Sequence, residues 1–220
     1  IDPGGEAGIH AGWDLWTGRG YYYCLLSLCR EAMSGYYLSQ GWLQNQYIRS
    51  FFKHYYGAWN HYYIGCLEDV RWHPWHMLAN GARGFGWYSL GQEIWGATTA
   101  DLQLSSDWVA AAPEFKTVAE CGELLARTEY QQDQVAIHYS QDSFQAGVGP
   151  ALSYVHQSFI NLFFDAGLPF RFVSYQQVAE GELSSKRYPL FILPHSISLS
   201  EGETKAIRAY AQEGGTVWAD

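Results

Sequence analysis

Cysteines are few in this sequence, and they form no recognisable pattern. Among 220 residues there are only four, Cys24, Cys29, Cys66 and Cys121, with no CxxC pair. Zinc sites and small disulfide-stapled domains both need characteristic cysteine spacings. We therefore expect free, buried thiols, which behave as small apolar side chains.

Basic residues and long apolar runs are also scarce. Lys and Arg total 13 against 22 Asp and Glu, which gives a formal net charge of -9. A nucleic-acid partner would need a basic face that binds phosphates, so we exclude one. No run of about 18 apolar residues is present, so we expect no membrane-spanning helix and no membrane partner. The sequence leaves the compartment open, with the cytoplasm favoured over secretion.

Metal and cofactor motifs are missing too. His73 and His76 lie three residues apart beside two tryptophans, but Pro74 separates them and no third ligand follows at helical spacing. A zinc ion held by a protein takes at least three side-chain ligands. We interpret the two histidines as packing residues of a helix face, and we predict no metal and no cofactor.

The second half of the chain shows a clear succession of strands. Short apolar runs with β-branched or aromatic residues, bounded by polar clusters, predict strands. They occupy residues 134–140, 170–174, 188–193 and 216–219. The run at 188–193 is apolar at almost every position, which is typical of a strand covered on both faces.

Two helices are predicted between these strands. Apolar residues recur at spacings of three and four over residues 151–166, and Gly167 marks the end of this helix. Ser200 and Glu203 match the capping box of a second helix, which runs to about residue 213. The order β-α-β-β-α-β with right-handed crossovers predicts a parallel α/β sheet.

Aromatic residues crowd the first half of the chain. Nine of the ten tryptophans precede residue 110, and tyrosines occur there in adjacent pairs and a triplet. Each buried indole N–H or phenol hydroxyl needs a partner, so a core alone does not require this many rings. Sugars stack their C–H faces on aromatic rings, so the composition favours a saccharide-binding surface. The alternative is a set of aromatic-rich loops.

Secondary structure in the first half is less clearly marked. The local patterns predict strands within residues 27–37, 46–52 and 82–90, helices at 67–80 and 113–125, a loop at 94–106 and a joint between domains at 128–133. Trp87 and Tyr88 come at the C-terminal end of the strand within 82–90, which is the end where barrel enzymes keep their sites.

Several phrases of the sequence resemble one enzyme family. QVAIHYSQDS, LFFDAGLPFRFVS and YPLFILPHSISLSEGETKAIRAYAQEGGTVWAD look like the flavodoxin-like trimerisation domain of family 42 β-galactosidases. RWHPWHMLANGARGFGWYSL is similar to the helix and last strand of the preceding catalytic barrel. The resemblance covers most of the chain from about Ile48 onward.

The resemblance implies two domains. Residues 1–127 would be the C-terminal part of a (β/α)8 TIM barrel, and residues 128–220 a flavodoxin-like (class I amidotransferase-like) parallel-sheet domain truncated at its C-terminus. A complete barrel needs roughly 250 residues. We therefore expect the chain to be a piece of a longer enzyme.

The resemblance also implies a reaction, the hydrolysis of terminal β-galactosides or related β-glycosides with retention. This chemistry needs two carboxyl groups about 5–5.5 Å apart. The sugar would stack on Trp59, Trp87 and Tyr88. By the family pattern the acid/base lies on the fourth barrel strand, which would fall before Ile1.

The second carboxyl group, the nucleophile, belongs at the end of the seventh barrel strand. If residues 46–52 are that strand, they contain no Glu, which departs from the family pattern. Glu31 and Glu6 are the catalytic candidates that remain, and Glu68 is expected to begin a helix, where a carboxylate favours the dipole. For each of these acids the alternative is a surface or capping role.

Pro194, His195 and Ser196 follow a strand end, where doubly wound folds place ligand groups. Amidotransferase chemistry is unsupported because no cysteine follows Cys121. As a hydrolytic pair, His195 and Ser196 lack a third orienting group and a G-x-S-x-G elbow. We therefore interpret this domain as non-catalytic, and the resemblance implies that it mediates a homo-oligomer, with a trimer expected.

Two other interpretations stay open. The barrel could have lost its carboxylates and serve as a carbohydrate-binding or structural protein. Alternatively, the second half could be a free-standing flavodoxin-like binding module with an unrelated aromatic appendage.

Overall fold

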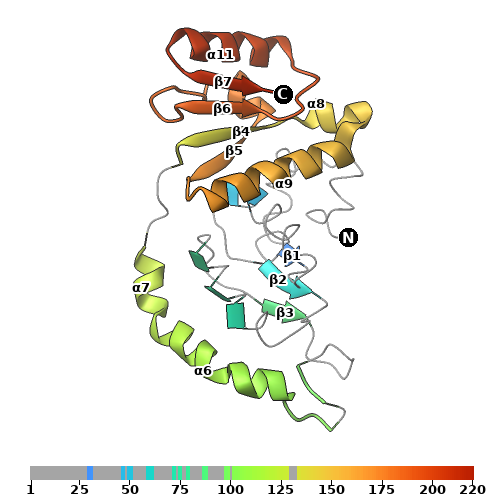
Figure 1. Cartoon of the computed structure of the whole chain (residues 1–220), viewed down its shortest axis with the longest axis vertical. Coiled ribbons are helices and arrows are strands. Elements are labelled where there is room, and N and C mark those ends of the chain that lie inside the picture. Colours follow the sequence, from blue (N-terminus) through green and yellow to red (C-terminus); the bar gives the residue numbers. More distant parts are fainter. Residues whose placement is uncertain are drawn as a thin grey trace. The chain divides into compact units, whose positions relative to one another are not determined.

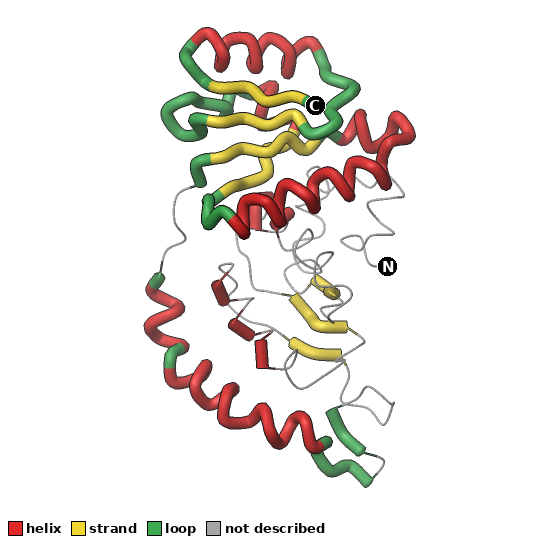
Figure 2. Tube along the Cα trace, viewed as in Figure 1, coloured by secondary structure: helices red, strands yellow, loops and turns green. Residues whose placement is uncertain are grey.

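The computed structural model describes residues 29–31, 46–47, 49–51, 58–61, 71–72, 74–75, 78–79, 86–88, 97–99, 101–128 and 133–220 (Figures 1 and 2). The chain divides into two compact units, one containing Gln131–Asp220 and the other containing Tyr21–Tyr130. Within the described residues, no helix has both the length and the apolar character needed to cross a bilayer.

A four-stranded sheet forms the centre of the C-terminal unit (Figure 1). In spatial order its strands are β5 (Phe170–Ser174), β4 (Val135–Tyr139), β6 (Leu190–Leu193) and β7 (Thr216–Ala219). Every neighbouring pair is parallel, which confirms the predicted parallel α/β sheet. From β4 the chain goes first to β5, on one side of β4, and then crosses to β6, on the other side of β4. The topological switch point therefore lies between β4 and β6.

Helices connect these strands. They are α8 (Gln141–Ser143), the π-helical turn η1 (Phe144–Val148), α9 (Gly149–Asp165), α10 (Tyr175–Ala179) and α11 (Glu201–Gln212). The ends of α9 and α11 agree with the sequence prediction within two residues. Helix α10 was not predicted, although Ser174 and Gln177 form its capping box.

The two faces of the sheet pack against different helices. Phe170 and Phe172 of β5 contact the rings of Phe163 and His156 on α9. Val173, the residue after Phe172, packs instead with residues of α10 and α11. Side chains alternate across a strand, so α9 covers one face and α10 and α11 cover the other.

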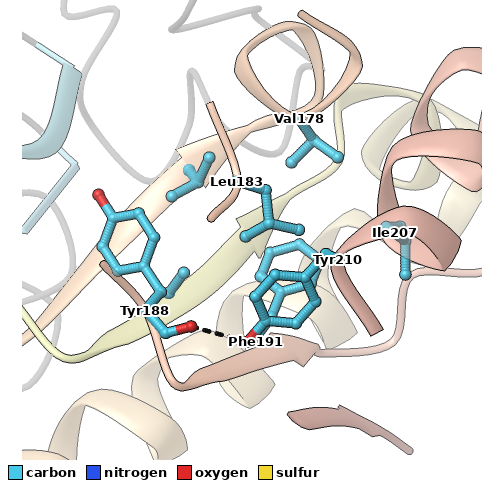
Figure 3. Packing of buried hydrophobic residues seen from close by; sticks show 8 residues of the cluster. Val178, Leu183, Tyr188, Phe191, Ile207 and Tyr210 are labelled. Carbon is cyan, nitrogen blue, oxygen red and sulfur yellow. Dashed lines mark hydrogen bonds between the residues drawn. The ribbon is translucent and has the colours of Figure 1, made fainter. Parts of the chain in front are cut away.

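The face under α10 and α11 carries a cluster of buried apolar residues (Figure 3). Phe191 of β6 packs at its centre against Tyr210 of α11, with ring centroids 6.0 Å apart. The Tyr210 hydroxyl donates to the backbone oxygen of Tyr188 at 2.8 Å. A Cβ atom at Gly215 would lie 2.2 Å from the Tyr210 ring, so only glycine fits beside it.

Three short parallel strands are described in the N-terminal unit. In spatial order they are β1 (Cys29–Glu31), β2 (Ala58–His61) and β3 (Gly86–Tyr88). Strands β1 and β3 lie within predicted strands, and β2 was not predicted. Helical residues between 71 and 79 agree with the predicted helix at 67–80.

The predicted strand at residues 46–52 is wrong, because Gln46, Tyr47 and residues 49–51 are helical. The rings of Tyr47 and Phe51 stack at 6.0 Å, and Arg49 Nε donates to Gln46 Oε1 at 2.9 Å. Side chains three and four residues apart meet only on a helix. The missing Glu in this segment therefore says nothing about a carboxylate at a strand end.

The predicted helix at 113–125 is longer and interrupted. It is observed as α6 (Ser106–Glu120) and α7 (Gly122–Arg127), separated at Cys121, which is a free, half-buried thiol. Pro113 was expected at the start but lies inside α6. Proline removes the N–H that would bond to the carbonyl of Val109, and both residues are exposed, so water can take over that bond.

Candidate functional site

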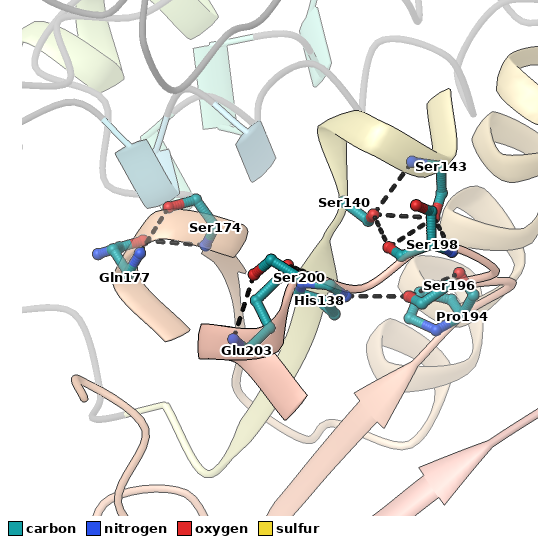
Figure 4. A network of polar contacts seen from close by, with 10 residues as sticks. All are labelled: His138, Ser140, Ser143, Ser174, Gln177, Pro194, Ser196, Ser198, Ser200 and Glu203. Carbon is teal, nitrogen blue, oxygen red and sulfur yellow. Dashed lines mark hydrogen bonds and ion pairs between the residues drawn. The ribbon is translucent and has the colours of Figure 1, made fainter. Parts of the chain in front are cut away.

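Polar side chains gather where the strands of the C-terminal sheet end (Figure 4). Strands β4 and β5 begin with buried apolar residues and then reach a polar one, His138 near the end of β4 and Ser174 at the end of β5. The loop that follows β6 adds Ser196 and Ser198. Because parallel strands end at the same edge of a sheet, His138 and the serines of this loop meet at the switch point between β4 and β6.

The centre of this site is a chain of three side chains, His138, Glu203 and Ser196. His138 Nε2 lies 2.9 Å from Glu203 Oε1, and His138 Nδ1 lies 3.0 Å from Ser196 Oγ. The side chain of His138 is 0% exposed and that of Glu203 is 2% exposed, whereas Ser196 is half-buried. Figure 4 shows His138 between the first turn of α11 and the loop after β6. Only the serine end of the chain is therefore open to a ligand.

The carboxyl group of Glu203 belongs to the start of α11. Its Oε2 accepts from the backbone N–H of Ser200 at 2.7 Å, while the Ser200 hydroxyl accepts from the Glu203 N–H. Burial alone would raise the pKa of Glu203, but hydrogen bonds from His138 and Ser200 outweigh it and hold the pKa below its ordinary value. The group is therefore an ionised carboxylate at neutral pH.

The charge of Glu203 fixes the proton positions on a neutral His138. A carboxylate only accepts hydrogen bonds, so Nε2 carries the imidazole proton and donates it to Glu203. The other nitrogen, Nδ1, then accepts from the Ser196 hydroxyl. The backbone oxygen of Pro194, 3.4 Å from Ser196 Oγ, is a second acceptor for the same hydroxyl proton.

Serine hydroxyls hold the loop after β6 against helix α8, which follows β4. Ser140 Oγ donates to Ser143 Oγ at 2.8 Å and lies 3.1 Å from the backbone oxygen of Ser198. In return, the Ser198 N–H donates to Ser143 Oγ at 3.1 Å. These bonds hold the Ser196 segment over the strand ends.

The residue before Ser196 has an unusual backbone. His195 adopts a φ of 46°, in the left-handed region that non-glycine residues rarely occupy. Its N–H donates to Asp220 Oδ1 at 2.5 Å. Such backbone strain is maintained only where the surrounding structure enforces it, and it clusters at functional sites.

A second buried histidine lies behind the site. His156 of α9 is fully buried between the rings of Phe144 and Phe172 and bonds to the backbone of His138. Burial, with a smaller contribution from His138, lowers the pKa of His156 to about 3. The hydrogen bond to the His138 backbone raises this pKa, but by less than burial lowers it. His156 is therefore neutral at physiological pH.

Of this site, the sequence drew attention to Ser196 alone, and a pairing with His195 was rejected for lack of a third group. Its hydrogen-bond partner is His138, 58 residues earlier. The third orienting group that was thought to be missing is Glu203, which sequence analysis assigned only to helix capping. A histidine among the apolar residues of β4 was the available signal, because a buried histidine needs partners for both nitrogens.

The predicted saccharide-site residues fall on the three strands of the N-terminal unit. Glu31 is the last residue of β1, and it pairs in register with Asn60 of β2, which pairs with Trp87 of β3. These three residues form one row across the sheet. Trp59 lies one position earlier in β2, and Tyr88 one position later in β3. Glu6 lies outside the described residues.

Asn60 and His61 of β2 were missed by the sequence analysis, because the four-residue segment AWNH has no apolar run to mark it as a strand. Glu31 is the only acidic residue in the three described strands. Among the described side chains, no group of three His, Cys, Asp or Glu residues could hold a metal ion. His73 and His76 lie outside the described residues.

Similar proteins were found among solved structures and not by comparison of the sequence. No family model and no curated protein matches the sequence. A catalytic mutant of Gan42B, a GH42 β-galactosidase from G. stearothermophilus, matches with a TM-score of 0.51 and 17% identity over 70% of this chain and 23% of that chain. The polyextremophilic β-galactosidase from the Antarctic haloarchaeon Halorubrum lacusprofundi matches with a TM-score of 0.52, at the same identity and coverage. The chain has the fold of part of a GH42 β-galactosidase.

The match includes residues of both units. Seventy per cent of 220 residues is about 154, which exceeds the length of the C-terminal unit, Gln131–Asp220. The chain spans about a quarter of the length of the β-galactosidases that it matches. At 17% identity the likeness concerns the fold and does not extend to individual residues.

Proposed function

We propose that this chain is part of a β-galactosidase-like glycoside hydrolase that cleaves terminal β-galactosides or related β-glycosides with retention. The fold shared with GH42 β-galactosidases is the observation that carries the proposal. Shared folds host different chemistries, so the assignment needs support from a site. The row of Glu31, Asn60 and Trp87 across the three strands supplies that support.

In this proposal the N-terminal unit is the end of a (β/α)8 barrel. Barrel enzymes build their sites at the C-terminal ends of the strands, and Glu31 occupies such an end. Glu31 would be one of the two carboxyl groups of a retaining mechanism, with its partner on a strand outside the described residues. Trp59, Trp87 and Tyr88 would stack against the sugar.

The C-terminal unit is proposed to be the flavodoxin-like module that mediates a trimer. Its strand order, second–first–third–fourth along the chain, agrees with the first four strands of the flavodoxin order. Analytical ultracentrifugation of the purified full-length protein tests this role. Sedimentation as a monomer at micromolar concentration would refute it.

Activity of the full-length protein on a chromogenic β-galactoside tests the proposed reaction. If Glu31 takes part in proton transfer or nucleophilic attack, Glu31→Gln should lower kcat/KM by about 10²–10⁴-fold. Glu120→Gln is a matched control, because this acid is exposed at the end of α6. Full activity of Glu31→Gln would remove Glu31 from the mechanism while leaving the hydrolase assignment in place.

A specific observation favours a second candidate, a carbohydrate-binding relative without hydrolytic activity. If β3 is the last barrel strand, its neighbour β2 is the seventh, where the family keeps its nucleophile. Strand β2 ends in Asn60 and His61 and contains no carboxylate. Calorimetric titration with galactose separates the candidates: binding that Trp87→Ala abolishes, without turnover by the wild type, would favour the binding protein.

A further inference from the structure

We propose that Ser196 is a nucleophile that accepts acyl groups from small esters, with His138 as its general base and Glu203 as the positioning residue. This activity would belong to the C-terminal unit and does not depend on the proposed glycosidase function. The arrangement is an acid–histidine–serine chain, which is recognised by geometry and not by the order of the residues along the sequence.

The distances suit nucleophilic catalysis. A serine is activated when its hydroxyl lies within about 2.6–3.2 Å of a base that a third group orients. Ser196 Oγ lies 3.0 Å from His138 Nδ1, and Glu203 lies 2.9 Å from the opposite nitrogen. The ionised Glu203 holds the proton on Nε2, so the lone pair of Nδ1 faces the hydroxyl that must lose its proton.

Burial protects the base and leaves the nucleophile accessible. His138 and Glu203 are shielded from water, whereas Ser196 is half-buried. The serine hydroxyls at positions 140 and 143 fix the loop that carries it. The strained backbone of His195 enforces the direction of the chain just before the nucleophile.

A purely structural role does not account for the charge of Glu203. The equivalent capping box of α10 uses the neutral Gln177, whose side chain accepts from the Ser174 N–H at 3.0 Å. Capping therefore needs no carboxylate in this unit. A buried carboxylate costs desolvation energy, and here its charge is directed at the imidazole that contacts Ser196.

The proposed step conserves atoms and electrons. Ser196 Oγ forms a bond to the carbonyl carbon of the ester as its proton passes to His138 Nδ1. The tetrahedral intermediate expels the alcohol oxygen, which takes the proton from Nδ1, and an acyl-serine remains. Water attacks the acyl carbon in the same way, its proton passing through Nδ1 to Ser196 Oγ, and the free acid leaves.

Turnover should be slow, because the nearby backbone donors are occupied. The N–H groups of His195, Ile197 and Ser198 donate to Asp220, to the backbone of His195 and to Ser143. Stabilisation of the oxyanion needs such donors, so these groups supply no ready oxyanion hole. We therefore expect covalent modification of Ser196 to be easier to detect than ester hydrolysis.

The first test is labelling of the purified chain with a fluorophosphonate probe, followed by peptide mass spectrometry. General-base assistance should make Ser196 react roughly 10²-fold faster than an unassisted serine. Ser185 is the matched comparison, because it is also half-buried and its hydroxyl donates to a backbone oxygen, that of Glu213, at 3.2 Å. Equal labelling of Ser196 and Ser185 would overturn the proposal.

The second test follows reactivity with pH and does not need a natural substrate. A thiol beside an oriented imidazole is deprotonated below its ordinary pKa of about 8.5. Ser196→Cys should therefore react with iodoacetamide at a lower pH than Ser185→Cys does, with mass spectrometry separating both from the native cysteines. Adding Glu203→Gln, which keeps the capping geometry but removes the charge, should shift the profile of Ser196→Cys toward that of the control. Identical profiles for the two cysteine variants would refute activation by His138.

Discussion

One buried stripe of helix α11 contacts two different parts of the interior, one polar and one apolar. Glu203 in its first turn belongs to the polar chain with His138 and Ser196, while Ile207 and Tyr210 belong to the apolar cluster. The positions are spaced by four and three residues, so they lie on the same helix face. All three residues are buried, with exposed fractions of 1%, 9% and 1%.

Equal burial has unequal consequences at the two ends of this stripe. At the apolar end, removing surface from water is itself stabilising, by about 25 cal/mol for each Å². At the polar end, burial is unfavourable unless every donor and acceptor keeps its partner. The polar end should therefore be sensitive to the loss of one partner and to pH, and the apolar end much less so.

The largest effect should follow from breaking the buried pair of His138 and Glu203. Glu203→Ala removes the partner of the imidazole and also the capping bond to Ser200. Leaving the buried imidazole N–H without its acceptor costs about 1–3 kcal/mol, and the lost capping bond adds about 1 kcal/mol. The measurement is the free energy of unfolding by urea denaturation.

Glu203→Gln is the matched control for this prediction, because an amide oxygen can still accept from His138 or from Ser200. We expect it to retain most of the stability that Glu203→Ala loses. Equal losses for both variants would mean that the charge, and not the hydrogen bonds, stabilises the fold.

Acid should lower the stability of the fold through the buried histidine behind the polar chain. The pKa of His156 is lowered to about 3 by burial, so between pH 6.5 and that value the unfolded chain binds a proton that the folded chain does not. The contribution of neutral His156 to stability is therefore complete above pH 6.5 and falls by about 1.4 kcal/mol for each pH unit below it. Below pH 4.5, protonation of Glu203, whose pKa is also lowered, adds to the loss.

Unfolding free energies of His156→Phe measured from pH 7 to pH 4.5 test this origin. The variant should lose most of the slope that the wild type shows. Ile160→Val is a suitable control, since Ile160 is fully buried on the same helix and its replacement removes a methylene without changing any titrating group. An unchanged slope in His156→Phe would assign the acid sensitivity to other groups.

Much of the C-terminal fold could be predicted from sequence, because local and tertiary preferences agree there. The apolar runs at β5 and β7 end where the strands end, and the capping box of Ser200 and Glu203 begins α11 as expected. In the N-terminal unit the same rules placed a strand at residues 46–52, because apolar and aromatic residues are adjacent there. The structure shows that the rings of Tyr47 and Phe51, four residues apart, stack on a helix.

The polar chain could not be predicted, because its members are far apart in sequence. Ser196 and His138 are separated by 58 residues, and Glu203 and His138 by 65. They meet only because the chain crosses from β5 past β4 to β6, which depends on the whole sheet. Each residue taken alone also has an ordinary structural explanation. Ser196 lies in a loop, His138 lies in a strand, and Glu203 caps a helix.

The smallest predicted effect lies at the apolar end and concerns the hydroxyl group of Tyr210. Tyr210→Phe keeps the ring against Phe191 and Gly215 but removes the donor to the backbone oxygens of Tyr188, at 2.8 Å, and Thr216, at 3.3 Å. A single hydrogen bond of this kind contributes about 1 kcal/mol, so the loss should be well below that of Glu203→Ala. Tyr154→Phe is the control, because Tyr154 is 65% exposed on α9 and its hydroxyl can bond to water. A loss of several kcal/mol for Tyr210→Phe, measured by urea denaturation, would show that the apolar end also depends on complete hydrogen bonding, and the proposed difference between the two ends of α11 would then be wrong.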